Sequence, residues 1–185
     1  MKAGVLALQG DFREHARVLA AAGATPVEVR SAEELAGVDL LAIPGGESTT
    51  MAKLARAGGL VEPVRERIAD GMPVFGTCAG LIVLAERVDG GDPLFGVLDV
   101  TVQRNAYGRQ VDSFEADVEV QGIDHPVRGV FIRAPRVEAV GEGVRVVAEH
   151  DGHPVVLQQG RILVASFHPE LVGETALHEY VMGKM

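Results

Sequence analysis

The first half of the chain alternates short apolar runs with helical patterns, and this alternation constrains the fold more than any other feature. Gly23 and Gly71 stand where two of the helical patterns should end, and Ser31 with Glu34 forms a capping box that should begin a short helix. Such alternation predicts a parallel sheet with helices on both faces. The strand patterns lie at residues 2–8, 25–29, 40–43 and 73–75, and the helical patterns at residues 12–22, within 44–70 and at 79–88.

The second half is dominated by short strand patterns. They lie at residues 100–103, 114–120, 127–132, 144–150, 154–159 and 161–167, and a closing helix is predicted at residues 174–182. We find no internal repeat, low-complexity tract or linker between the halves. We therefore expect these strands to extend the same sheet, so that residues 1–185 form a single α/β domain.

Composition excludes several classes of protein. The chain carries a formal charge of −9 without a cluster of Lys or Arg, so it should repel nucleic acid and anionic membranes. No stretch approaches the roughly 20 apolar residues that cross a bilayer, and the apolar run at residues 2–8 is too short for a signal peptide. The single cysteine excludes an internal disulfide and fits a reducing compartment. We therefore expect a cytoplasmic protein with neither a nucleic-acid nor a membrane partner.

Cys78 is the strongest candidate for a catalytic residue. It lies in the sequence Gly-Thr-Cys-Ala-Gly at residues 76–80, between a predicted strand and a predicted helix. Small flanking residues permit the tight nucleophile elbow that exposes a side chain, and a helix N-terminus favours the thiolate. A lone cysteine is more often a small buried apolar residue, but glycines on both sides of this junction favour the nucleophile.

His168, Pro169 and Glu170 form the second candidate, just after the predicted strand at residues 161–167. Proline disfavours helical backbone at His168, and residues two apart in an extended chain point the same way, so Glu170 should reach the imidazole. Taken alone, this motif is better interpreted as a surface turn. Because ligands gather at the carboxyl ends of parallel strands, pairing with Cys78 makes a Cys-His-Glu triad plausible.

A glycine-rich segment, Pro-Gly-Gly-Glu-Ser-Thr at residues 44–49, follows the strand pattern at residues 40–43. Backbone N–H groups at a helix start can bind phosphate, but no lysine follows the glycines and Glu47 would repel a phosphate. The same N–H groups suit an oxyanion, and Glu47 suits a substrate ammonium group. A merely tight turn is the alternative.

The other histidines give little functional signal. His15 lies on a helix that we expect at the surface, His125 precedes a proline, His178 is in the last helix, and His150 and His153 flank an Asp-Gly turn. With one cysteine and no carboxylate cluster at ligand spacing, we expect no metal site.

Longer stretches of the chain resemble the class I glutamine amidotransferases, and within them the glutaminases that serve pyridoxal 5′-phosphate synthase. The resemblance implies a flavodoxin-like α/β fold, a three-layer sandwich around a mostly parallel sheet. It also implies hydrolysis of L-glutamine to L-glutamate and ammonia, and passage of the ammonia through a tunnel in a synthase subunit that makes pyridoxal 5′-phosphate, vitamin B6, within a large hetero-oligomer. The matching stretches are residues 8–10, 13–15, 44–51, 75–81, 104–105, 108–115, 131–135 and 166–170.

The resemblance also implies a set of substrate contacts, and it places the region of Gln9 against the synthase subunit. We expect the Cys78 thiolate to attack the amide, and His168, oriented by Glu170, to protonate the ammonia and then activate water. This chemistry needs no cofactor. The implied glutamine site comprises Gly45, Gly46, Glu47, Arg104, Ile132 and Arg133, and the expected oxyanion hole comprises the N–H groups of Gly46 and Ala79.

Partner-gated activity is a further expectation. The gate would be the Gly45–Gly46 peptide, held by a hydrogen bond from Gln9. Two other functions stay open: a stand-alone cysteine hydrolase or peptidase, and a non-catalytic binding subunit. Glu47 and Arg104 argue against the first because they suit a free amino acid, and an intact triad argues against the second.

Overall fold

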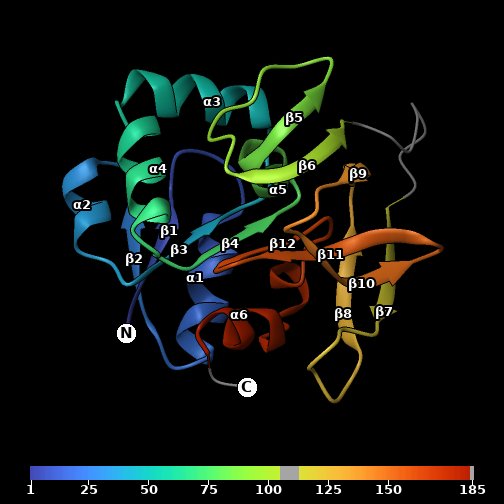
Figure 1. Ribbon diagram of the computed structural model, residues 1–185. Helices are drawn as coiled ribbons and strands as arrows, with labels where there is room; N and C mark the ends of the chain where they lie inside the picture. Colours follow the sequence, from blue (N-terminus) through green and yellow to red (C-terminus); the bar gives the residue numbers. More distant parts are fainter. Residues whose placement is uncertain (105–112, 184–185) are drawn as a thin grey trace.

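The computed structural model describes residues 1–104 and 113–183 (Figure 1). Asn105 and residues 108–112 of the resembling stretches lie outside them. At the centre is a seven-stranded sheet of order β10-β11-β12-β4-β3-β1-β2, in which β2, β1, β3, β4 and β12 run parallel. The predicted mostly parallel sheet is thus confirmed. Its strands are β1 Lys2–Leu6, β2 Thr25–Val29, β3 Leu40–Ile43, β4 Val74–Thr77, β10 Arg145–His150, β11 His153–Gln159 and β12 Ile162–Ala165.

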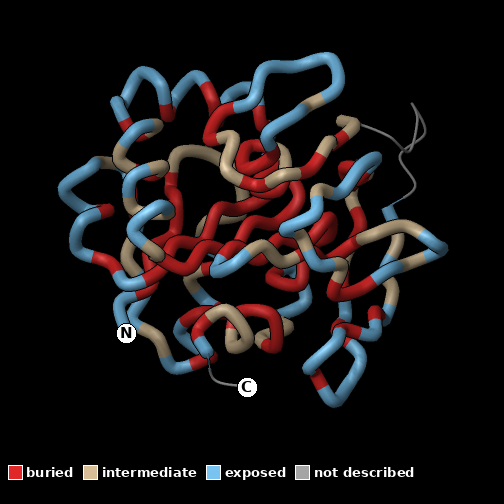
Figure 2. Tube along the Cα trace, in the orientation of Figure 1, coloured by how far each residue is buried: buried red, intermediate tan, exposed pale blue. Residues whose placement is uncertain are grey.

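Helices cover both faces of this sheet, with α1 and α6 on one side and α2 to α5 on the other (Figure 1). Alternate side chains of β3 serve the two layers: Leu41 packs in one core with Met51 of α3, and Ala42 in another with Leu19 of α1. Figure 2 shows the central strands buried between the two layers. The helices are α1 Phe12–Ala21, α2 Ala32–Ala36, α3 Ser48–Ala57, α4 Val61–Ala69, α5 Ala79–Leu84 and α6 Ala176–Val181.

Local signals place several helix ends as predicted. The capping box at α2 is present: Ser31 Oγ accepts from the Glu34 N–H at 3.3 Å, and Glu34 Oε2 accepts from the Ser31 N–H at 3.0 Å. Gly23 and Gly71 follow α1 and α4 with positive φ angles of 81° and 90°. Glycine adopts this left-handed conformation at little steric cost, so both helices end there.

The predicted helix at residues 79–88 is wrong in its second half. Helix α5 ends at Leu84, and the chain continues as strand β5, Ala85–Asp89. The last carbonyls of the helix accept from a later loop: the Phe95 N–H donates to Val83 O at 2.8 Å, and the Val97 N–H donates to Leu84 O at 2.9 Å. These acceptors are therefore unavailable to a further helical turn.

The expectation that all later strands extend the central sheet is also wrong in part. Only β10, β11 and β12 do so. Strand β5 pairs with β6, Leu98–Gln103, which pairs with β9, Arg136–Val140, and β7, Phe114–Val118, pairs with β8, Val127–Phe131. Strand β9 was not predicted. No helix within the described ranges is long and apolar enough to span a membrane.

The fold brings the candidate motifs to one edge of the sheet. The chain leaves β1, β3, β4 and β12 at their carboxyl ends and reaches Gln9, Gly45, Cys78 and His168, respectively, within three residues. A backbone bridge between Val130 and His168, with N···O distances of 2.8 and 3.1 Å, attaches the end of β8 at the same place. Ile132 and Arg133 follow β8 and therefore lie beside the other motifs.

Candidate active site

Cys78 occupies a strained turn between β4 and α5. Its φ of 48° and ψ of −101° lie in a region that side-chain-bearing residues seldom adopt, as expected for a nucleophile elbow. Neighbouring backbone lies so close to positions 76 and 80 that only glycine fits there. A Cβ at Gly80 would lie 2.2 Å from Ile43 O, and one at Gly76 would lie 2.9 Å from the Gly80 carbonyl carbon. The turn leaves the thiol at the N-terminus of α5, where it lines a pocket.

His168 and Glu170 make the predicted contact, with Nδ1 and Oε1 2.8 Å apart, although for a different reason. The chain is not extended here. Pro169 is helical, with φ −71° and ψ −29°, and Glu170 begins a 3-10 helix, η1 Glu170–Val172. Glu170 is 3% exposed, so its carboxylate lies behind the imidazole rather than in the pocket.

Asp11 is a second carboxylate at the same imidazole, and sequence reasoning missed it. Its Oδ2 lies 2.8 Å from His168 Nδ1. Burial lowers the pKa of His168, but hydrogen bonds with Asp11, Cys78 and Glu170 outweigh this and raise it to about 12. The charged ring therefore lies next to the Cys78 side chain. The signal for Asp11 was its position just after Gln9 and Gly10, at the carboxyl end of a predicted strand.

Among the described residues, Asp11, His168 and Glu170 are the one group close enough to hold a metal ion, with their ligand atoms within 4.8 Å of one another. Both carboxylates approach the same ring nitrogen, Nδ1, at 2.8 Å. That nitrogen carries the proton that both oxygens accept. The contacts are therefore those of a hydrogen-bonded imidazolium.

His15 and His178 are buried, which contradicts the expected surface position of His15. Both are 0% exposed and their rings meet, with His15 Nδ1 2.9 Å from His178 Nε2. His15 Nε2 lies 2.9 Å from Thr77 Oγ1 and 3.4 Å from Glu170 Oε1. A sequence signal was present, because His15 shares one helical face with the buried residues Val18 and Leu19.

The glycine-rich segment forms the turn from β3 into α3. Glu47 caps α3: its carboxylate accepts from the backbone N–H groups of Thr49 and Thr50 at 3.0 and 2.7 Å. The side-chain hydrogen bond from Thr50 contributes most to lowering the pKa of Glu47 to about 2, although burial opposes it. Glu47 therefore stays ionised at neutral pH and lies on the wall of the pocket.

The residues after β1 hold this turn in place. The expected hydrogen bond from Gln9 to the Gly45–Gly46 peptide is displaced by one residue: Gln9 Oε1 accepts from the Glu47 N–H at 2.7 Å. The Gly45 carbonyl instead accepts from the Asp11 N–H at 3.3 Å. Gly45 faces the catalytic candidate, since a Cβ there would lie 2.1 Å from His168 Cε1.

These elements enclose a pocket of about 640 Å³. Arg104 lies at its wall, with Nη2 3.7 Å from Glu47 Oε1 and 3.1 Å from Thr49 Oγ1. Gly45, Ala79 and Gln9 lie outside the lining. The lining comprises Asp11, Gly46, Glu47, Ser48, Cys78, Ile82, Arg104, Ile132, Arg133, His168 and Leu171.

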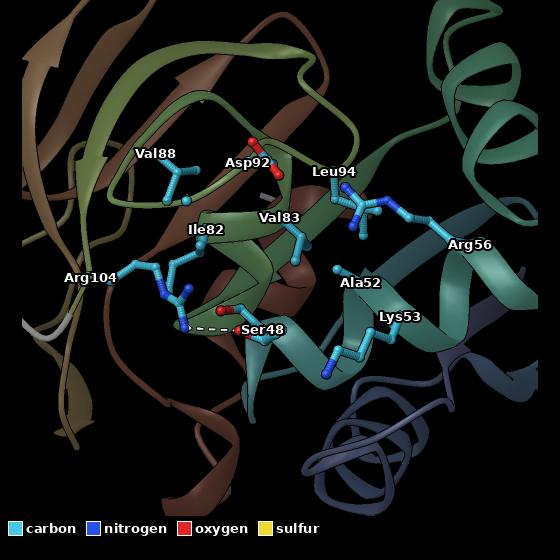
Figure 3. Close-up of a pocket in the computed structure, with 12 residues that line it drawn as sticks. Ser48, Ala52, Lys53, Arg56, Ile82, Val83, Val88, Asp92, Leu94 and Arg104 are labelled. Carbon is cyan, nitrogen blue, oxygen red and sulfur yellow. Dashed lines mark hydrogen bonds between the residues drawn. The ribbon is translucent and has the colours of Figure 1, made fainter.

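A smaller pocket of about 250 Å³ adjoins the first and shares Ser48, Ile82 and Arg104 with it. Figure 3 shows the Arg104 guanidinium directed toward the start of α3. Arg104 is thus placed by α3, and its charge faces the larger pocket beside Glu47.

Comparison with known proteins finds relatives that match almost the whole chain. The chain matches the SNO glutamine amidotransferase family over residues 5–185. It is 57% identical to "Pyridoxal 5'-phosphate synthase subunit PdxT" of Acidothermus cellulolyticus, covering 97% of this chain and 91% of that protein. It is 53% identical to the protein of the same name from Niallia circulans, covering 98% and 96%.

Solved structures share the fold. A crystal structure of a glutamine amidotransferase superposes with a TM-score of 0.93 at 50% identity, covering 98% of this chain and 97% of that one. The PurLQS structure from Thermotoga maritima superposes with a TM-score of 0.76 at 18% identity, covering 99% and 95%, and this likeness concerns the fold alone.

Proposed function

The chain belongs to the SNO glutamine amidotransferase family, and from this premise we propose how its site works as a glutaminase. It hydrolyses L-glutamine to L-glutamate and ammonia as a subunit of pyridoxal 5′-phosphate synthase. One observation carries the assignment of the site: an elbow cysteine and an imidazole held by a buried carboxylate meet at the wall of one pocket.

In the first half-reaction the Cys78 thiolate attacks the amide carbon of the glutamine side chain. The carbonyl oxygen becomes an oxyanion, which accepts hydrogen bonds from the N–H groups of Ala79 and Gly46. His168 gives its proton to the nitrogen, the C–N bond breaks, and ammonia leaves a thioester on Cys78.

In the second half-reaction His168, now neutral, takes a proton from water as the water oxygen attacks the thioester. The C–S bond breaks, glutamate leaves, and the thiolate and imidazolium are restored. Glu170 and Asp11 accept from His168 Nδ1 throughout, so the other ring nitrogen is left to face Cys78. No cofactor takes part.

We assign recognition of the free amino acid to charges at the pocket wall. Glu47 and Arg104 lie 3.7 Å apart, and Arg133 lines the same space, so one substrate ammonium and one carboxylate can each meet an opposite charge. Gly46 and Ile132 supply backbone at the same wall, and Gly45 lies just behind Gly46 in the turn. This pattern favours an amino acid over a peptide, because a peptide lacks the free termini.

We further propose that the ammonia passes to a synthase subunit within a hetero-oligomer, and that contact between the two subunits affects the active site through Gln9. Gln9 precedes α1 and binds the peptide that follows Gly46, so a partner touching Gln9 would act on the oxyanion turn. A cytoplasmic location is part of the proposal, since the free thiol of Cys78 suits a reducing compartment.

The test measures glutamate release by the purified chain, with and without the synthase subunit. We expect weak activity alone, strong activity with the subunit, and none above background in Cys78→Ala. A stand-alone hydrolase would be fully active alone, and a binding subunit would be inactive in both. His168→Asn should be nearly as severe as Cys78→Ala, and Glu170→Gln somewhat less. Normal hydrolysis by all three variants would exclude the triad.

A further inference from the structure

A chain of buried polar groups continues behind Glu170, away from the pocket. His168 Nδ1 contacts Glu170 Oε1, which lies 3.3 Å from Thr77 Oγ1 and 3.4 Å from His15 Nε2. His15 in turn contacts His178 of α6 at 2.9 Å. The side chains of His15 and Glu170 are 0% exposed. The mechanism above does not use His15 or His178.

The contacts at Glu170 determine where the proton of His15 Nε2 lies. Burial raises the pKa of Glu170, but the charge of His15 and hydrogen bonds from His15 and His168 lower it well below its usual range, so the carboxylate is ionised. If Nε2 carried no proton, it would face a carboxylate oxygen at 3.4 Å, and the single Thr77 hydrogen could be donated to His15 or to Glu170 but not to both. With a proton on Nε2, Thr77 accepts from His15 and donates to Glu170, so each of these two hydrogen bonds has its own hydrogen.

The contact with His178 holds the other ring nitrogen of His15. Burial and the charge of His15 lower the pKa of His178 to about 3, so His178 is neutral and carries one ring proton. His178 Nδ1 has no hydrogen-bond partner within the described residues, so its Nε2, 2.9 Å from His15 Nδ1, makes the ring's polar contact.

We propose that His15 is a positioning residue for the glutaminase reaction: its Nε2–H holds the Glu170 carboxylate for His168, directly and through Thr77, and His178 holds the other ring nitrogen of His15. The inference rests on the glutaminase function proposed above. The groups that face His15 are Glu170 of η1, His178 of α6 and Thr77 of β4, with the Phe75 ring edge-on at a centroid distance of 6.1 Å.

The arrangement matters when His168 gives up its proton. Glu170 then loses the positive charge beside it, and burial alone would favour its protonated form. A protonated Glu170 could no longer accept from His168 Nδ1 and fix the tautomer that turns the other ring nitrogen to Cys78. The N–H of His15 and the hydroxyl of Thr77 take no part in the proton transfer, and hydrogen bonds to a carboxylate favour its charged form, so Glu170 stays ionised through the whole cycle.

The direct test is nitrogen NMR of the chain labelled with ¹⁵N-histidine, near neutral pH, without substrate. The spectrum of His15→Gln identifies the His15 signals by their loss. We expect a proton on Nε2 of His15. A His15 with a bare Nε2 would overturn the proposal. Because this measurement does not involve turnover, it stands even if the glutaminase assignment fails.

The functional test is the kcat and KM of His15→Leu, which keeps apolar volume but removes the ring N–H, in the complex with the synthase subunit. Loss of the hydrogen bond to the ionised carboxylate should lower kcat on the order of 10- to 100-fold, while KM changes by less than about twofold because His15 does not line the pocket. The exposed His125→Leu is the matched control and should match the parent. An unchanged kcat, or a loss confined to KM, would contradict the proposal.

A comparison at His178 separates positioning from packing. In His178→Gln the side-chain amide can still hydrogen-bond with His15 Nδ1, whereas His178→Leu keeps apolar volume but removes that partner. We expect His178→Gln to retain most of the kcat and His178→Leu to lose it, with both folded by circular dichroism. Equal kcat values in the two variants would assign His178 to the core alone.

Discussion

Gly45→Ala should disable the active site while leaving the fold intact. A Cβ at this position would lie 2.1 Å from His168 Cε1 and 2.8 Å from Nδ1, whereas ordinary contacts begin at 3.4 Å. The imidazole must therefore move by more than about 1 Å, a displacement that can cost about 100-fold in rate. The movement would also disturb the 2.8 Å contacts with Asp11 and Glu170. Overpacking of this kind costs about 1–3 kcal/mol of stability.

The assay combines glutamate release in the complex with alkylation of Cys78 in the isolated chain. Alkylation needs the thiolate but no oxyanion hole, so slowing of both reactions indicates that the imidazole has moved. Gly143→Ala is the control, because a Cβ there meets nothing within 4 Å. It should react like the parent. A folded Gly45→Ala chain with the parent's kcat would refute the inference that Gly45 is glycine because of His168.

Three further predictions concern the pocket and its turn. Arg133→Ala should raise the KM for glutamine strongly, because a substrate carboxylate would lose its partner; unchanged kinetics would assign Arg133 to the fold or to the partner interface. Gln9→Ala should lose most of the stimulation by the synthase subunit while its basal glutamate release changes little, and full stimulation would exclude this gate. Glu47→Gln should lower the free energy of unfolding by about 0.5–1 kcal/mol at pH 7, because Glu47 caps α3. Since folding lowers the pKa of Glu47 from 4.5 to about 2, the difference should be present above pH 4.5 and shrink as the pH falls toward 2; urea unfolding at pH 7 and pH 3 measures it, and an equal difference at both values would contradict it.

Signals that are local in sequence predicted much of the fold and site. The capping box at Ser31 and the glycines around Cys78 depend on neighbours within a few residues, and the structure has both. The parallel sheet then brings Cys78 and His168 to one edge, since β4 and β12 are adjacent. Strand order itself was not needed for this prediction, because ligand sites form at the carboxyl ends of the strands.

Features that depend on distant contacts were missed or wrong. His15 meets Thr77 and His178 across sequence separations of 62 and 163 residues, so nothing near it in the sequence shows what its ring contacts. Helix α5 ends because the N–H groups of Phe95 and Val97, in a loop further along the chain, hydrogen-bond to its last carbonyls. Glu170 reaches His168 through a helical Pro169, a conformation that the residue pattern alone did not distinguish from an extended one.

The segment after β1 connects both halves of the catalytic machinery. Gln9 accepts from the Glu47 N–H and Asp11 donates to the Gly45 carbonyl, so these two residues position the turn proposed to bind the oxyanion. The Asp11 side chain also accepts from His168. A shift of this segment would therefore move the oxyanion turn and the general base together. Partner contact at Gln9 would then control attack on the amide and protonation of ammonia as one event, rather than either step alone.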